Sequence, residues 1–113
     1  GAALVDFDTS TLLEVAEDVG RHNAVDKVLG ARLRLGDYPV QSPSALLVSG
    51  RISYEIIQKA ALAAVGAVAG IGAPTSLAVD AAQAAGLTLV GMVKGGTANR
   101  YAGSIDITGS SVL

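Results

Sequence analysis

Residues 45–72, "ALLVSGRISYEIIQKAALAAVGAVAGIG", indicate the fold class, because they predict a strand, a helix and a second strand. Residues 45–50 and 67–72 are short apolar runs that end in glycine, as strands buried on both faces of a sheet do. Between them, "SYEIIQKAALAAVG" (53–66) predicts a helix with Ser53 as candidate N-cap. Two strands joined by a helix favour parallel pairing and an α/β fold.

The segment before this unit predicts a hairpin and a first helix. "ALVDF" and "LLEVA" flank the turn-forming "DTST", which is typical of a β-hairpin. Asn23 is the candidate N-cap of the following helix, and Asp26 is placed to suit the helix dipole. Apolar residues recur at helical spacing at Val25, Val28, Leu29 and Leu33.

The segment after it continues the alternation. "TSLAVDAAQAAG" (75–86) predicts a helix capped by Thr75 or Ser76 and closed by Gly86. "LTLVGMV" (87–93) predicts a strand, "KGGTANR" a glycine loop, and "YAGSIDI" (101–107) a closing strand. We therefore expect residues 1–113 to form a single α/β domain. It should be a three-layer sandwich with a mixed sheet of five or more strands.

Composition excludes several classes of protein. A net charge of −2 argues against binding of nucleic acid by a basic face. The chain has no cysteine and one histidine, so it lacks a thiolate nucleophile and the zinc-deaminase signature, and we expect no zinc. Residues 60–79 carry no charge over about the length of a membrane span. Three glycines and Pro74 interrupt them, so no membrane helix is expected.

Polar residues gather where the predicted strands end. The four junctions are "AEDVGRHN", "SGRIS", "GAPTS" and "GMVKGGT", and each contains glycine. Ligands of open α/β sheets bind beyond the carboxyl ends of the strands, where helix N-termini present free N–H groups. The sequence therefore predicts one pocket for a polar, anionic ligand. Its candidate cations are Arg21, Arg51, Lys94 and Arg100.

Each junction also has a purely structural interpretation. His22 can be a hydrogen-bonded structural histidine, and Asp18 and Arg21 can pair at the surface, which contributes little to stability. "APTS" can be an ordinary helix start and "KGG" a hairpin tip. A catalytic triad assembled from Ser49 or Ser53 with His22 and Asp18 lacks the G-x-S-x-G elbow that would present the serine.

Four stretches in this order and spacing resemble the formate dehydrogenase accessory sulfurtransferase family, FdhD. They are "EDVGRHNAVDKVLG" (17–30), "SGRISYE" (49–55), "APTSLA" (73–78) and "LVGMVKGGTANRY" (89–101). The resemblance implies a cytidine-deaminase-like fold. Zinc deaminases of that fold carry their metal ligands at two helix starts. In this chain the corresponding starts carry "GRHNA" and "SGRIS", and the resemblance implies a pocket without zinc. It also implies transfer of sulfur from a cysteine desulfurase to the bis(molybdopterin guanine dinucleotide) molybdenum cofactor, which formate dehydrogenase needs.

The resemblance assigns site residues by position. The family's cofactor-binding loop matches Met92, Val93, Lys94, Gly95, Gly96 and Thr97. The same pocket is expected to include Arg21, His22, Ser49, Gly50, Arg51, Pro74, Thr75 and Ser76. GDP, which shares the guanine and diphosphate, should act as a partial mimic of the cofactor.

The family's sulfur-carrying cysteine belongs to a C-x-x-C loop that precedes the matched region, and this chain has no cysteine. We therefore expect the C-terminal, cofactor-binding core of a longer FdhD-type protein, which does not transfer sulfur alone, and we assign no catalytic residue. The resemblance implies a cytoplasmic homodimer with cysteine desulfurase and formate dehydrogenase as partners. The alternative is a noncatalytic nucleotide- or pterin-binding module or scaffold.

Overall fold

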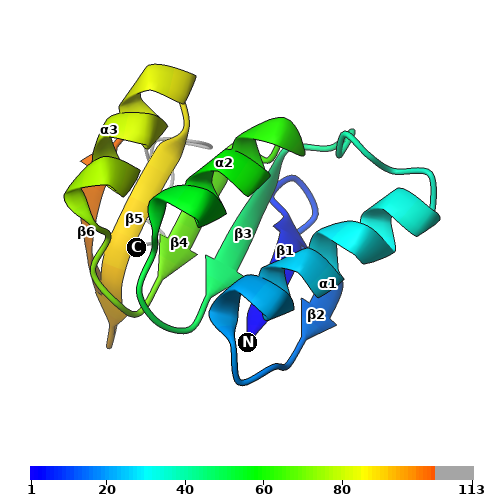
Figure 1. The fold of residues 1–113 in the computed structure, drawn as a ribbon, viewed down its shortest axis with the longest axis horizontal. Helices are drawn as coiled ribbons and strands as arrows, with labels where there is room; N and C mark the ends of the chain where they lie inside the picture. Colours follow the sequence, from blue (N-terminus) through cyan, green and yellow to red (C-terminus); the bar gives the residue numbers. More distant parts are fainter. Residues whose placement is uncertain (104–113) are drawn as a thin grey trace.

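The computed structural model describes residues 1–103, with the side chain of Arg21 left out. It contains six strands and three helices within those residues (Figure 1). The strands are β1 (Ala2–Asp6), β2 (Thr11–Ala16), β3 (Ser44–Val48), β4 (Ala67–Gly70), β5 (Thr88–Lys94) and β6 (Thr97–Ala102). The helices are α1 (Arg21–Arg34), α2 (Tyr54–Leu62) and α3 (Ser76–Ala85).

The predicted hairpin is confirmed as the antiparallel pair β1–β2. A carboxylate organises its turn: Asp6 Oδ1 accepts hydrogen bonds from the backbone N–H of Asp8 at 2.8 Å and of Thr9 at 3.2 Å. The bond from Thr9 is the main reason why the pKa of Asp6 lies below its ordinary value, because it favours the charged carboxylate.

All six strands form one mixed sheet in the order β2-β1-β3-β4-β5-β6, which confirms the predicted α/β class. Strand β1 is antiparallel to both β2 and β3, while β3, β4 and β5 are mutually parallel and β6 returns antiparallel to β5. Strands β2, β3, β4 and β5 therefore run in the same direction, and their carboxyl ends share one edge of the sheet.

The core lies between the sheet and the three helices, which all cover the same face (Figure 1). Right-handed crossovers explain this placement, because each one steps in the same direction along the sheet. The largest fully buried apolar side chains are Leu4, Leu46, Ile52, Ile56, Ile57, Leu89, Val25, Val28 and Val68. Each such side chain contributes about 1.5–3 kcal/mol through burial.

The opposite face of the sheet carries no helix in residues 1–103 (Figure 1). Large apolar side chains stand exposed on it, among them Val15 (60%) and Leu47 (40%). The described residues thus supply two layers of the expected three-layer sandwich.

The predicted starts of α1 and β6 were wrong. Helix α1 begins at Arg21, so Gly20 and not Asn23 is its N-cap. Gly20 is extended, and its N–H donates to the Asp18 carboxylate at 3.0 Å, which fixes the turn into the helix early. Strand β6 begins at Thr97, inside the predicted glycine loop, because only Gly95 and Gly96 are needed to reverse the chain. Residues 104–107 of the predicted closing strand lie outside the described residues.

Helix α3 was predicted correctly at both ends. Thr75 is its N-cap, with Oγ1 accepting from the N–H of Ala78 at 3.1 Å, and Gly86 closes it at φ 69°. Helix α2 is shorter than expected: it ends at Leu62, and Ala64 takes a left-handed conformation at φ 61° before β4. None of the helices described is both long enough and apolar enough to cross a membrane.

Candidate functional site

The four predicted junctions meet at the edge where the parallel strands end, and hydrogen bonds link each to the next. His22 Nε2 lies 2.8 Å from Ser53 Oγ, which joins the start of α1 to the start of α2. Thr75 N–H donates to Ile52 O at 3.0 Å, which joins the starts of α2 and α3. Met92 N–H donates to Gly72 O at 3.1 Å, which joins β5 to the loop before α3.

Glycines let these loops approach closely. A Cβ on Gly72 would lie 2.6 Å from Gly50 O, and a Cβ on Gly91 would lie 3.0 Å from Gly72 O. The first distance is shorter than real Cβ atoms show and the second is tighter than nearly all of them, so the edge is built from backbone packed on backbone. Its length from β2 to β5 is four strand spacings, about 19 Å. An elongated ligand suits this edge better than a single small anion.

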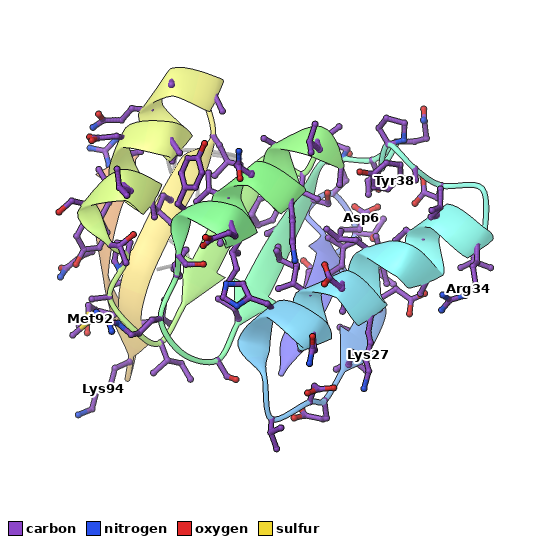
Figure 2. The ribbon with its side chains drawn as sticks, in the orientation of Figure 1. Asp6, Lys27, Arg34, Tyr38, Met92 and Lys94 are labelled. Atoms are coloured by element: carbon purple, nitrogen blue, oxygen red, sulfur yellow. The ribbon has the colours of Figure 1, made fainter. Side chains whose placement is uncertain are left out.

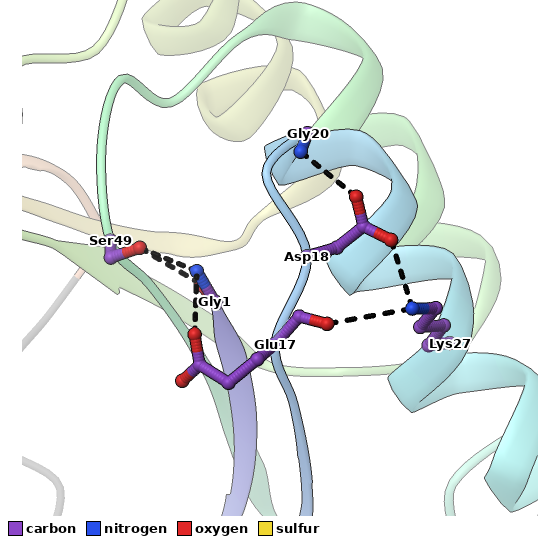
Figure 3. Close-up of polar contacts among 6 residues, drawn as sticks. All are labelled: Gly1, Glu17, Asp18, Gly20, Lys27 and Ser49. Atoms are coloured by element: carbon purple, nitrogen blue, oxygen red, sulfur yellow. Dashed lines mark hydrogen bonds and ion pairs between the residues drawn. The ribbon is translucent and has the colours of Figure 1, made fainter.

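The entrance to α1 is an ordered turn (Figure 3). Asp18 Oδ2 pairs with Lys27 Nζ at 2.9 Å, while its Oδ1 accepts from Gly20 N–H. The hydrogen bond from Lys27 is the largest reason why the pKa of Asp18 falls to about 2, with Gly20 next. Lys27 also donates to Glu17 O at 3.4 Å. Asp18 therefore holds the turn and pairs with Lys27, whereas the possible Asp18–Arg21 pair involves a side chain outside the described residues.

Arg21 keeps its backbone place at the first position of α1, but its side chain lies outside the described residues. The next residue, His22, has a side chain that is 40% exposed, and its Nε2 is 3.9 Å from Glu55 Oε1. Its closer partner is Ser53, which is only 8% exposed. Ser53 occupies the N-cap position of α2 as predicted, yet its side chain makes no capping bond.

Sequence reasoning omitted Ser53 from the site residues, since a serine before a helix indicates a cap. The only available signal was that His22 and Ser53 both stand at strand-to-helix junctions. Nothing in the spacing of 31 residues shows that the two side chains meet. Three predicted residues, Pro74, Thr75 and Ser76, do lie together at the start of α3. Pro74 pairs with Ile52 as an isolated parallel bridge, and the Thr75 hydroxyl is used in capping.

The predicted cofactor-binding loop is a tight turn between β5 and β6. Gly95 and Gly96 have φ values of 55° and 86°, and Thr97 Oγ1 donates to Lys94 O at 2.8 Å. Met92 also has a positive φ, 57°, at an irregularity in the β5–β6 pairing. Such a conformation is uncommon for a residue other than glycine and often marks a functional segment. Figure 2 shows Met92 and Lys94 together at this end of the molecule.

Arg51 and Lys94 are exposed and form no ion pair among the residues described. The other edge cation, Arg100, donates to Gly103 O at 2.8 Å. Arg51 and Lys94 are thus the described cations that are available to offset a ligand's charge. No group of three or more histidine, cysteine or acidic side chains within residues 1–103 has the arrangement of a metal site.

A hollow of about 560 Å³ lies on the helix-free face near the same edge. It takes in only two predicted site residues, Ser49 and Val93, together with apolar side chains such as Leu47 and Ile71. Ser49 Oγ accepts from the Gly1 amino group at 2.7 Å (Figure 3). An apolar lining does not suit a polyanionic ligand, so the polar edge at the helix starts is the stronger candidate for such a site.

The fold and this edge define an α/β domain with a candidate ligand site at the carboxyl ends of its strands. Comparison with known proteins then gives the family. The FdhD/NarQ family model matches residues 1–108, and the chain belongs to that family.

Relatives and a solved structure agree with this assignment. A sulfur carrier protein FdhD from Streptomyces coelicolor is 52% identical over 91% of this chain. One from Anaeromyxobacter dehalogenans is 58% identical over 77% of it. A crystal structure described as that of a formate dehydrogenase accessory protein from Desulfotalea psychrophila superposes with a TM-score of 0.77. It is 31% identical and covers 89% of this chain.

The chain spans about a third of the length of these relatives: 36% of the Streptomyces protein, 32% of the Anaeromyxobacter protein and 42% of the solved chain. The activity of the whole relatives is therefore a separate question from the properties of this domain.

Proposed function

We propose that this chain is the cofactor-binding core of a sulfurtransferase and holds the bis(molybdopterin guanine dinucleotide) cofactor as cargo. The observation that carries the proposal is the continuous edge from the start of α1 to the β5–β6 turn, in a member of the FdhD/NarQ family. Its backbone N–H groups suit diphosphates, and Arg51 and Lys94 supply positive charge. The length of the edge suits an extended dinucleotide.

In the proposed reaction, sulfur passes from a cysteine desulfurase to the cofactor and so prepares it for formate dehydrogenase. The chain has no cysteine, so the sulfur-carrying thiol must come from polypeptide other than these 113 residues. The role of the residues present is to bind and orient the cofactor while that thiol approaches. We expect this chain alone to form no persulfide and to bind no stoichiometric zinc.

Calorimetry with GDP tests the binding site. Lys94→Ala should weaken GDP binding about tenfold or more, because a charge-assisted hydrogen bond contributes roughly 1.5–3 kcal/mol and about 1.4 kcal/mol is a factor of ten. Lys27 is unsuitable as the control because it pairs with Asp18 at the edge itself. Arg34→Ala is the matched control, since Arg34 ends α1 away from this edge (Figure 2) and forms no ion pair among the described residues.

Equal weakening by Lys94→Ala and Arg34→Ala would indicate diffuse attraction of an anion and would contradict the site. Absence of GDP binding by the parent chain would contradict binding by this domain alone.

The second candidate is a noncatalytic nucleotide- or pterin-binding module or scaffold, and the absence of cysteine favours it. The two candidates differ when a cysteine-bearing FdhD N-terminal segment is supplied in trans with a cysteine desulfurase. Sulfuration of the cofactor that requires this chain supports the sulfurtransferase. Cofactor binding without any gain in sulfuration supports the module.

The family resemblance also suggests a cytoplasmic homodimer. The exposed apolar residues of the helix-free face, such as Val15 and Leu47, are consistent with association of this domain. Sedimentation of the purified chain over a range of concentrations tests the dimer. A monomer at every concentration would exclude a dimer formed by this domain alone.

A further inference from the structure

The His22 imidazole is held at one end and open at the other. Its Nε2 lies 2.8 Å from Ser53 Oγ, which bridges α1 and α2, and the Ser53 residue is 8% exposed. Its Nδ1 has no hydrogen-bond partner among the described residues, and 40% of the His22 side chain is exposed. The ring is therefore anchored through Nε2, and Nδ1 has no hydrogen-bond partner among the described residues.

The buried hydroxyl decides which nitrogen carries the proton. Ser53 Oγ has His22 Nε2 as its hydrogen-bond partner among the described residues. Buried donors are costly to leave unpaired, so the Ser53 O–H donates to Nε2. A neutral imidazole has one donor and one acceptor nitrogen, so Nδ1 then carries the proton. The nearest carboxylate oxygen of Glu55, 3.9 Å from Nε2, is too distant for a hydrogen bond that would reverse this choice.

We propose that Ser53 is a positioning residue: it fixes the His22 ring and its tautomer so that Nδ1–H donates to an oxygen of the bound anion. The inference rests on the proposed function, in which a nucleotide diphosphate lies along this edge. This positioning role adds a specific hydrogen-bond donor to the site. It also explains why the Ser53 side chain does not cap α2. A hydrogen bond from one ring nitrogen commonly sets the state of the other in this way.

Nitrogen-15 NMR of the ring tests the positioning directly, since His22 is the only histidine in the chain and its signals are unambiguous. At a pH where the ring is neutral, the parent should show the Nδ1–H tautomer. Ser53→Ala should shift the ring toward a mixture with Nε2–H, and Ser53→Thr, which keeps the hydroxyl, should restore the parent pattern. Amide spectra of each variant show whether it is folded.

GDP calorimetry tests the donor with variants at the more exposed His22, which do not depend on a buried substitution. His22→Asn keeps an amide N–H near the position of Nδ1, whereas His22→Gln keeps one near Nε2. We expect His22→Asn to bind GDP within about threefold of the parent and His22→Gln to bind about tenfold more weakly, as loss of one charge-assisted hydrogen bond predicts. Ser53→Ala added to the His22→Gln variant should cause no further loss of GDP affinity.

An unchanged tautomer in folded Ser53→Ala overturns the positioning role, whether or not GDP binds. Equal GDP affinity of the His22→Asn and His22→Gln variants overturns the Nδ1 donor. Failure of the parent to bind GDP contradicts the proposed function and the donor role, while the tautomer measurement still decides the positioning role by itself.

Discussion

At the scale of single residues, Asp18 shows how one carboxylate organises the candidate site. It holds Gly20 N–H and Lys27 together, and its pKa is lowered from 3.8 to about 2. A lowered pKa means that the charged form stabilises the folded state. This contribution is fully present above about pH 5 and is lost progressively as the pH falls from there toward the folded-state pKa of about 2.

We therefore expect the stability advantage of the parent over Asp18→Asn to shrink between pH 5 and pH 2. Urea unfolding at several pH values measures it. Asp80→Asn on α3 is the control, because Asp80 is exposed and forms no ion pair among the described residues. A constant difference between the parent and Asp18→Asn across this range would show that the carboxylate does not stabilise the fold through its charge.

Two buried serines should respond to truncation in opposite directions. Ser44 is 1% exposed, and its hydroxyl has no hydrogen-bond partner in the described part of the chain, whereas the Ser53 hydroxyl pairs with His22. Ser44→Ala removes an unsatisfied polar group and should leave stability unchanged or raise it by about 1 kcal/mol. Ser53→Ala should lower stability by about 1 kcal/mol. Denaturant midpoints compare the two, and a clear loss in Ser44→Ala would reveal a partner for that hydroxyl.

At the scale of elements, glycines have contrasting roles in α1 and at the site edge. Gly30 lies inside α1, where a Cβ would meet only Arg34 Nη1 at 3.5 Å. Gly72 precedes α3, where a Cβ would lie 2.6 Å from Gly50 O. Both glycines are ordinary in the sequence, so only their surroundings distinguish them.

Gly30→Ala should raise the free energy of unfolding by about 0.5–1 kcal/mol through helix propensity. Gly72→Ala should lower it by about 1–3 kcal/mol, because backbone must move to admit the methyl group. Thermal unfolding measures both. If Gly72→Ala were as stable as the parent, the loops before α2 and α3 would not be packed as closely as the structure has them.

At the scale of the whole molecule, the helix-free face exposes apolar side chains of the described residues, among them Val15 and Leu47. We expect the parent chain to bind a hydrophobic dye and to self-associate, and Leu47→Lys in the central strand β3 to reduce both. Stability should change little, since Leu47 is already 40% exposed. Leu62→Lys is the control, because Leu62 is 73% exposed at the end of α2. Equal reductions in dye binding and association by both variants would mean that no particular face is responsible.

The local elements and the order in which they occur could be predicted from the sequence alone. Apolar runs bounded by glycine located β3, β4 and β5, and Thr75 with Gly86 defined both ends of α3. These signals are local, because a strand's burial, a cap or a left-handed C-terminus depends on a few neighbouring residues. The shared edge of the junctions also followed from sequence, since parallel strands place their carboxyl ends together.

Which side chains meet at that edge could not be predicted, because it depends on how the helices pack across the sheet. The pairing of Asp18 with Lys27, and of His22 with Ser53, depends on where α1 and α2 lie across the sheet. The same is true of the early start of α1 at Gly20, where a carboxylate outside the helix fixes the turn. Sequence spacing carries no record of such contacts, because packing of whole elements brings the partners together.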